Sequence, residues 1–355
     1  MKALNVARRF LPLVCLVVTV SLVALTVGCG GGVGKPWSGV FIKYSGNPIL
    51  VRTPDAWDHY QVGTGCVIKA GDTYYLYYHG GREGSGHMEI GMATSGAPHG
   101  PWQKSALNPI LSLGPEGAWD DSCVDRPRVV KFGETYYMYF EGQQRVENRP
   151  GGWPWRIGLA TARSPEGPWV KHLANPMVDI GGPGEWDHTG IYLGSAVERD
   201  GRYYLWYSGF SGTLDQYGGI GLATAPRPDG PWTKYAGNPV LLPGPKGAWN
   251  WFGIQEPMVV YRDGLFHMWV AGNQGDDPWY SDIGYYYSRD GVQWLTSVDN
   301  PVLSRGGEGE WDHINVSEPF AYIEGDVIYL YYMGLTRPPE PIYTSSWGLA
   351  TGRFR

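Results

Sequence analysis

The stretch IGLATAPRPDGPWTKYAGNP at residues 220–239 contains three elements that recur along the sequence. They are an Ile-Gly-Leu-Ala-Thr segment, a Gly-Pro-Trp turn and an Asn-Pro pair. The Asn-Pro pairs lie 61, 67, 63 and 62 residues apart and begin at Asn47, Asn108, Asn175, Asn238 and Asn300. A further tryptophan follows each pair, at Trp57, Trp119, Trp186, Trp249 and Trp311. Five related units at a nearly fixed period indicate a fold built from one repeated supersecondary unit.

Each unit predicts four short strands. Aromatic runs such as Tyr74–Tyr78 and Tyr203–Tyr207 alternate with glycine, aspartate and proline, as strands alternate with turns. Asp-Gly pairs such as Asp200-Gly201 supply the positive-φ positions of tight hairpins. One such sheet cannot bury both of its faces, so neighbouring sheets must stack. We therefore predict an all-β fold over residues 37–355, a five-bladed β-propeller with four antiparallel strands per blade.

The last unit lacks its outer strand, and the N-terminal segment matches the missing piece. Only Gly352 to Arg355 follow the final Trp-Gly-Leu-Ala-Thr segment. Residues 41–47, which read FIKYSGN, match residues 232–238, which read WTKYAGN. We expect this N-terminal strand to complete the last blade, which closes the ring and removes an open sheet edge.

The composition of the 355 residues agrees with an all-β protein. There are 53 glycines and 28 prolines, 14% of the residues are aromatic and only 17% are charged. A disordered chain has the opposite balance of hydrophobicity and charge. The net charge of −6 leaves no basic surface for nucleic acid.

The first residues resemble an export signal. Lys2 and Arg8 precede an apolar run that ends at Cys29, and small residues directly before a cysteine are similar to a bacterial lipobox. We expect a lipoprotein-type signal peptide at 1–28, lipidation of Cys29 and a glycine-rich tether at 29–36, with a cleaved signal or an uncleaved anchor as alternatives. The chain is then lipid-anchored at the cell envelope or secreted. Export would allow a disulfide between Cys66 and Cys123, although we do not expect one.

The repeat phrases resemble the five-bladed propeller glycosidases, glycoside hydrolase families 43 and 130. The phrases are Asn-Pro-Ile-Leu, Trp-Asp, Tyr-Tyr-Met-Tyr, Ile-Gly-Leu-Ala-Thr and Gly-Pro-Trp-x-Lys. The resemblance implies an axial pocket with carboxylates on the innermost strands, and mostly inversion of configuration. The sequence departs from family 130 where Arg126 replaces its acid, and from family 43 where the first and third units offer Thr64 and Leu193. The invertase motifs Asn-Asp-Pro-Asn-Gly and Arg-Asp-Pro are absent.

The repeats differ most at the position seven residues after the repeat tryptophan. This position holds Thr64, Arg126, Leu193, Glu256 and Glu318. Hydrolysis of a glycosidic bond requires one protonated carboxyl and one carboxylate. We predict Glu318 as the acid and Glu256 as the base, with Asp125 as an alternative base or as a modulator of the pKa. The alternative is that these carboxylates bind backbone amides or Arg126 and only hold the mouth of the channel.

Further candidates for substrate binding lie beside this position and at the rim. Arg126 and Arg128 would favour uronic-acid or sulfated sugars if both face the axis, and salt bridges are the alternative. The residue after each repeat tryptophan is interpreted as a turn residue that caps local amides, and it is Asp58, Asp120, Asp187, Asn250 or Asp312. The residue after it varies and is His59, Asp121, His188, Trp251 or His313. These side chains, with the loop residues Trp155 and Trp279, are candidates for contacts with sugar, although the histidines are also compatible with ordinary surface loops. Their wide spacing does not predict a metal site.

The preferred hypothesis is an exported glycoside hydrolase of the inverting type, acting on oligo- or polysaccharides as a monomer. The alternatives are a non-catalytic carbohydrate-binding propeller and a glycoside phosphorylase. No cofactor is predicted, and a structural ion such as calcium in the channel stays open. The expected partner is a carbohydrate, with no nucleic acid and with a membrane contacted only through the lipid anchor.

Overall fold

The computed structural model describes residues 34–81, 87–145, 154–211, 218–275, 280–336 and 344–354. These residues form strands, bridges and turns, and no helix occurs among them. Accordingly, no helix in the described ranges is long and apolar enough to cross a membrane. The all-β prediction is confirmed.

The strands form successive four-stranded antiparallel groups. One group contains β2 (Gln61–Ala70), β3 (Thr73–Gly81), β4 (Met88–Ser95) and β5 (Gln103–Lys104). The next contains β6 (Cys123–Phe132), β7 (Thr135–Gln143), β8 (Trp155–Ala162) and β9 (Val170–Lys171). A third contains β10 (Gly190–Arg199), β11 (Arg202–Phe210), β12 (Gly219–Ala225) and β13 (Thr233–Lys234). Another contains β14 (Gly253–Arg262), β15 (Leu265–Asn273), β16 (Ser281–Ser288) and β17 (Leu295–Thr296). The last combines β18 (Asn315–Glu324), β19 (Val327–Thr336) and β20 (Thr344–Arg353) with β1 (Ile42–Lys43).

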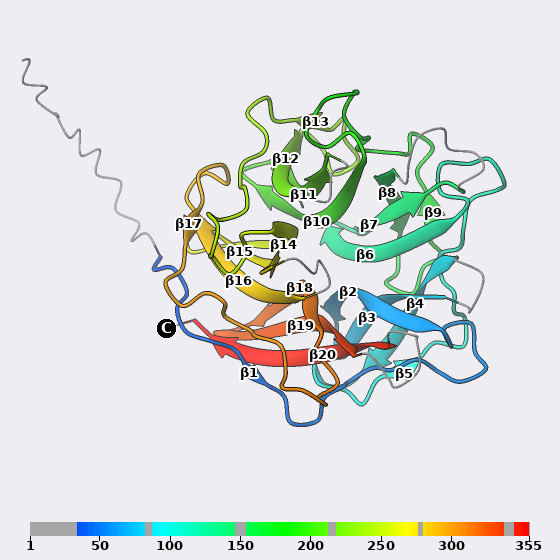
Figure 1. Ribbon diagram of the computed structural model, residues 1–355. Helices are drawn as coiled ribbons and strands as arrows, with labels where there is room; N and C mark the ends of the chain where they lie inside the picture. The colour runs from blue at the N-terminus through cyan, green and yellow to red at the C-terminus, as the bar shows by residue number, and fades with distance from the viewer. Residues whose placement is uncertain are drawn as a thin grey trace, which may run out of the picture. The chain divides into compact units, whose positions relative to one another are not determined.

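The first strand of each group lies towards the centre of the unit formed by residues 34–355 (Figure 1). In order, β2 contacts β6, β6 contacts β10, β10 contacts β14, β14 contacts β18, and β18 contacts β2. Single parallel pairings, Met88 with Cys123 and Ser281 with Asn315, join two pairs of groups into eight-stranded sheets. The remaining sheet has four strands, and none of the described sheets closes on itself through hydrogen bonds.

The N-terminal segment pairs with the last strand of the chain. Ile42 lies opposite Thr351 and Lys43 opposite Ala350, in the register in which Thr233 and Lys234 of β13 pair with β12. Trp37 is buried, and its indole Nε1 donates to the carbonyl of Arg353 at 3.1 Å. The predicted match between residues 41–47 and 232–238 therefore corresponds to an equivalent strand position.

The repeat glycines leave room for the repeat tryptophans. A Cβ on Gly91 would lie 2.5 Å from the ring of Trp57, and one on Gly80 would lie 3.0 Å from the same ring. Trp57 packs on Tyr78 with ring centroids 5.6 Å apart. Any larger residue at these glycines would displace the tryptophan, which explains why both glycines recur with it.

The aspartate after each repeat tryptophan has a structural role, but its partner differs from the predicted one. Asp58 is fully buried, accepts a hydrogen bond from the Tyr78 hydroxyl at 3.0 Å and pairs with the Lys104 ammonium at 2.5 Å. The equivalent lysine–aspartate pairs are Lys171–Asp120, Lys234–Asp187 and Lys43–Asp312. Where the lysine is replaced by Thr296, the aspartate is replaced by Asn250, so the buried charge and its counter-charge are lost together.

Cys66 and Cys123 are buried, and neither forms a disulfide. Burial raises the pKa of the Cys66 thiol to about 12, so this side chain is a neutral core group that accepts a hydrogen bond from the amide of Val129.

Candidate active site

A β-bulge interrupts each central strand at the position where the repeats differ. The pairing register shifts between Asp125 and Arg128 in β6, and equivalent shifts occur in β2, β10, β14 and β18. Arg126, Glu256 and Glu318 adopt positive φ angles of 43°, 60° and 50°. Bulges redirect side chains, and a non-glycine residue in this conformation carries strain that commonly accompanies function. The residues that differ between the repeats therefore lie at bulges, and three of them adopt positive φ angles.

Arg126 is the centre of the candidate site. Its Nε donates to Glu318 Oε1 at 2.9 Å, and its Nη1 donates to Glu141 Oε2 at 2.9 Å. Asp125 Oδ2 lies 3.8 Å from Nη1, and Glu256 Oε1 lies 3.9 Å from Nη2. The side chain of Arg126 is 16% exposed, whereas those of the four carboxylates are at most 6% exposed. One guanidinium thus gathers four buried carboxylates from β6, β7, β14 and β18.

The two predicted glutamates are linked through the backbone. Glu318 Oε2 accepts hydrogen bonds from the amide of Thr64 at 3.0 Å and from its hydroxyl at 2.6 Å. The amide of Glu318 donates to Glu256 Oε2 at 2.7 Å, and the amide of Glu256 donates to the Ser208 hydroxyl at 2.7 Å. The divergent positions of different groups therefore form one connected network.

The environment separates the pKa values of the two glutamates. Burial, followed by the charge of Glu318, raises the pKa of Glu256 to about 7. Burial opposes ionisation of Glu318 as well, but Arg126, His79 and the Thr64 hydroxyl outweigh it and hold the pKa of Glu318 at about 2. The close contact with Arg126 Nε is the decisive difference. Glu256 is therefore suited to hold a proton and Glu318 to remain ionised, which is the reverse of the predicted assignment.

Asp125 lies at the edge of this network. Burial raises its pKa to about 7, and Arg126 lowers the pKa only partly because the two groups are 3.8 Å apart. Its Oδ1 atom is buried and accepts no hydrogen bond in the described structure. Asp125 is thus placed as a modulator of the neighbouring charges, one of the two roles that the sequence analysis left open.

Glu141 was not identified from the sequence, although it belongs to the cluster. It is fully buried in β7 and lies opposite Asp125 in the register of β6 and β7. Burial, with Arg126 acting against it, raises its pKa to about 8. A signal exists at the residue before the repeat glycine of each second strand, where the units hold His79, Glu141, Ser208, Ala271 and Met333. This second divergent position pairs across the hairpin with the residue directly before the first one, as Glu141 does with Asp125.

Arg128 does not join the carboxylates in the way that Arg126 does. It is buried, its Nε donates to the carbonyl of Gly194 at 3.2 Å, and its Nη1 donates to the carbonyl of Gly65. The guanidinium also lies over the ring of Phe320 at 5.6 Å. Side chains alternate between the two faces of a regular strand, and on that basis Arg126 and Arg128 were predicted to share a face. The bulge at Arg126 interrupts this alternation. Arg128 thus joins three central strands, without the salt bridge we considered.

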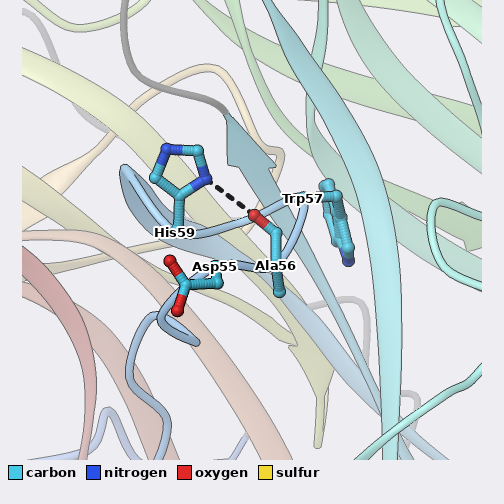
Figure 2. A pocket seen from close by; sticks show the side chains of 4 residues that line it. All are labelled: Asp55, Ala56, Trp57 and His59. Atoms are coloured by element: carbon cyan, nitrogen blue, oxygen red, sulfur yellow. Dashed lines mark hydrogen bonds between the residues drawn. The ribbon is translucent and has the colours of Figure 1, made fainter.

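The three rim histidines occupy equivalent turns and do not come together. In each, ring Nδ1 contacts the carbonyl three residues earlier: His59 to Ala56 at 2.7 Å, His188 to Glu185 at 2.7 Å and His313 to Glu310 at 2.8 Å. A pocket of about 470 Å³ is lined by Asp55, Ala56, Trp57 and His59. Figure 2 shows these four side chains and the contact of His59 with the carbonyl of Ala56. The residues that line this pocket come before β2 in the sequence and include none of the four carboxylates around Arg126. We therefore regard the pocket as a feature of the rim.

The remaining candidates lie around the site or outside the described residues. Asp121 accepts hydrogen bonds from the amides of Gly117 and Arg145 at 2.7 Å each, which is a loop-bracing role. Trp155 is half-buried and packs edge-on against Tyr192 at 6.2 Å, and Tyr192 in turn lies under Arg126 at 4.7 Å. Trp251 is half-buried beside Phe252. Trp279 and Cys29 lie outside the described residues.

The described residues contain no group of three or more histidine, cysteine, aspartate or glutamate side chains arranged to hold a metal ion. The four carboxylates surround a guanidinium, which supplies the positive charge at their centre.

Comparison with known proteins finds similarity to glycoside hydrolases. The model of the family described as glycosyl hydrolases family 32 N-terminal domain matches residues 172–318, less than half of the chain. Two uncharacterized proteins from strains of Mycobacterium tuberculosis are each 27% identical over 201 residues. The alignment covers 54% of this chain and 63% of each relative, so the chain spans less than two thirds of their length.

Solved structures show the same fold. A protein described as a glycoside hydrolase has a TM-score of 0.68 at 16% identity, covering 88% of this chain and 92% of its own. A thermostable family-43 glycoside hydrolase has a TM-score of 0.61 at 18% identity, covering 85% and 92%. A β-1,2-mannobiose phosphorylase from Listeria innocua, solved with β-1,2-mannobiose, has a TM-score of 0.63 at 14% identity, covering 88% and 97%. The predicted resemblance to the propeller glycosidase families is confirmed at the level of the fold.

Proposed function

We propose that this protein is a glycoside hydrolase whose catalytic pair is Glu256 and Glu318. The observation that carries the proposal is the unequal contact of two buried, linked glutamates with Arg126, whose Nε lies 2.9 Å from Glu318 Oε1 and whose Nη2 lies 3.9 Å from Glu256 Oε1. This contact lowers the pKa of Glu318 to about 2, whereas burial raises that of Glu256 to about 7. Pairs of carboxyls with separated pKa values identify acid and base roles in hydrolases of this kind. Glu256 donates the proton to the leaving oxygen, and Glu318 supplies the carboxylate.

The proposed substrate is a neutral sugar. Four carboxylates surround Arg126, and two of its nitrogens are already bonded to Glu318 and Glu141. A substrate carboxylate or sulfate would have to displace these two groups from the guanidinium. The structure therefore argues against the uronic-acid and sulfated substrates considered from the sequence. Arg126, the most exposed member of the cluster, is placed to meet a sugar oxygen first.

The direct test is a screen of the purified protein against neutral aryl-glycosides and oligosaccharides, with matched uronides, in the presence and absence of phosphate. We expect phosphate-independent release of reducing sugar from neutral substrates. Strict dependence on phosphate would identify a phosphorylase, and binding without turnover would identify the non-catalytic propeller. Either result would contradict the proposal.

The pH dependence of hydrolysis is set by the protonation of the proposed general acid, Glu256. Glu256 must be protonated, and its pKa is raised to about 7. Glu318 stays ionised at all pH values above about 2. We expect kcat/KM to fall about tenfold per pH unit above the pKa of Glu256, with a plateau on the acidic side of it. A profile that rises through pH 7 would contradict this assignment. Measurements from pH 4.5 to 9 on one aryl-glycoside suffice.

We propose inversion of configuration, export and a monomeric state on the sequence evidence. Inversion is tested by ¹H NMR of the first-formed anomer, where the substrate and product anomers should differ. Export and lipidation of Cys29 are tested by fractionation with a Cys29→Ser control, in which membrane retention should be lost.

We further propose that the unit is a five-bladed propeller closed by its N-terminal strand. The pairing of β1 with β20 and the contact between β18 and β2 support it. Deletion of residues 37–46 would uncover the edge of β20 and remove Trp37 and Phe41 from the core. We expect a protein that aggregates or loses its cooperative unfolding transition. A truncated protein with an unchanged melting temperature would contradict closure.

A further inference from the structure

Glu141 occupies a position between two groups of strands. Its Oε2 accepts the hydrogen bond from Arg126 Nη1 at 2.9 Å, and its Oε1 accepts one from the amide of Leu193 at 2.6 Å. Leu193 is the residue at which the pairing of β10 shifts register. One carboxylate therefore connects β7 and the bulge of β10 to the central guanidinium.

This double contact constrains the orientation of Arg126. With Nη1 held by Glu141, Nε points to Glu318 at 2.9 Å, while Nη2 lies 3.9 Å from Glu256. The guanidinium is planar, and the ring of Tyr192 lies 4.7 Å beneath it. With one of its nitrogens held as well, the guanidinium has little freedom to rotate. This orientation decides that Arg126 forms a hydrogen bond to Glu318 and only a longer contact to Glu256.

We propose that Glu141 is a positioning residue, which holds the guanidinium of Arg126 against Glu318 rather than Glu256 and so assigns the two glutamates their different roles. The inference rests on the proposed function. Glu141 is itself fully buried and has both oxygens occupied, so it is not placed to touch the substrate.

The charged and titratable groups that act on Glu141, Arg126 and the two glutamates come from several strands. Asp125, Arg126 and Arg128 belong to β6, His79 to β3, Glu256 to β14 and Glu318 to β18. Burial lowers the pKa of His79 to about 4, so this imidazole is neutral at pH 7 and does not replace the arginine charge. Replacing Glu141 releases Arg126 Nη1, which lets the guanidinium approach Glu256. A closer positive charge should lower the pKa of Glu256.

The first test compares Glu141→Gln with the exposed control Glu134→Gln on the turn between β6 and β7. We expect kcat of Glu141→Gln to fall roughly 10- to 100-fold, the range for loss of a hydrogen bond to a charged group. The basic limb of its pH profile should move to lower pH, whereas Glu134→Gln should match the wild type. A basic limb at the same pH in Glu141→Gln as in the wild type would overturn the proposal.

Glu141→Asp provides a second variant in case the glutamine variant does not fold. It keeps the charge but is one methylene too short to hold both Arg126 and Leu193. We expect it to show a similar fall in kcat, and wild-type kcat would contradict a positioning role.

Thermal unfolding gives a readout that does not need activity. The folded-state pKa of Glu141, about 8, lies above the ordinary value of 4.5, so its contribution to stability is present below pH 4.5 and is lost as the pH rises through 8. Glu141→Gln lacks this loss, so its melting temperature relative to wild type should rise from pH 5 to pH 9. A difference independent of pH would overturn the placement of Glu141 even if the protein hydrolyses no glycoside.

Discussion

Replacement of either Glu256 or Glu318 by glutamine is expected to reduce hydrolysis of an unactivated oligosaccharide by roughly 10²–10⁴-fold, the contribution of a positioned proton-transfer group. Glutamine keeps the size of each side chain but can neither donate a carboxyl proton nor carry the negative charge. Glu256→Gln should fold normally, because Glu256 is already disposed to be uncharged in the folded state. Glu318→Gln should be less stable, because Arg126 loses its closest carboxylate partner.

The control for both variants is Glu134→Gln, which removes a carboxylate from an exposed turn and should leave hydrolysis unchanged. Initial rates at pH 6 and melting curves for the three variants separate loss of chemistry from loss of fold. Full activity in both Glu256→Gln and Glu318→Gln would refute the assignment of the site.

Replacement of Arg126 by leucine is expected to give the largest loss of stability. It leaves Asp125, Glu141, Glu256 and Glu318 buried without their common cation. Breaking a buried ion pair by removing one partner costs about 3–5 kcal/mol. The loss should be larger at pH 8 than at pH 5, because the carboxyls escape the repulsion by taking up protons at the lower pH.

Urea unfolding at pH 5 and pH 8 measures this effect directly. The control is Arg227→Leu, which breaks the surface pair with Asp229 at 3.0 Å. Arg227 is 66% exposed, and pairs of this kind contribute little to stability. Equal stability of Arg126→Leu and wild type at pH 8 would contradict the central role of this arginine.

The periodicity of the sequence was sufficient to predict the strands, because five units repeat the same aromatic and glycine positions. Departures from the repeat also predicted the candidate site. Residues that pack a group of strands recur, as Trp57 and Gly91 do, whereas Arg126, Glu256 and Glu318 break the pattern at one equivalent position. The structure places these three at bulges with positive φ angles.

The assignment of acid and base could not be predicted in the same way. It depends on which carboxylate receives Arg126 Nε, and this contact joins residues 192 positions apart in the sequence. Glu141 was not predicted because it lies on the second strand of its group, and only the pairing of β6 with β7 brings it opposite Asp125. His59, His188 and His313 also differ from their neighbours in the repeat, and each contacts a backbone carbonyl of its own turn. Their contact with sugar stays a prediction.

The most direct test of the central claim compares leaving groups. A substrate with an acidic leaving group, such as a dinitrophenyl glycoside, needs no proton from the enzyme. If Glu256 is the acid and Glu318 the required carboxylate, Glu256→Gln should recover most of its activity on this substrate relative to a poor leaving group. Glu318→Gln should remain impaired on both. Recovery in Glu318→Gln with none in Glu256→Gln would reverse the roles and contradict the account.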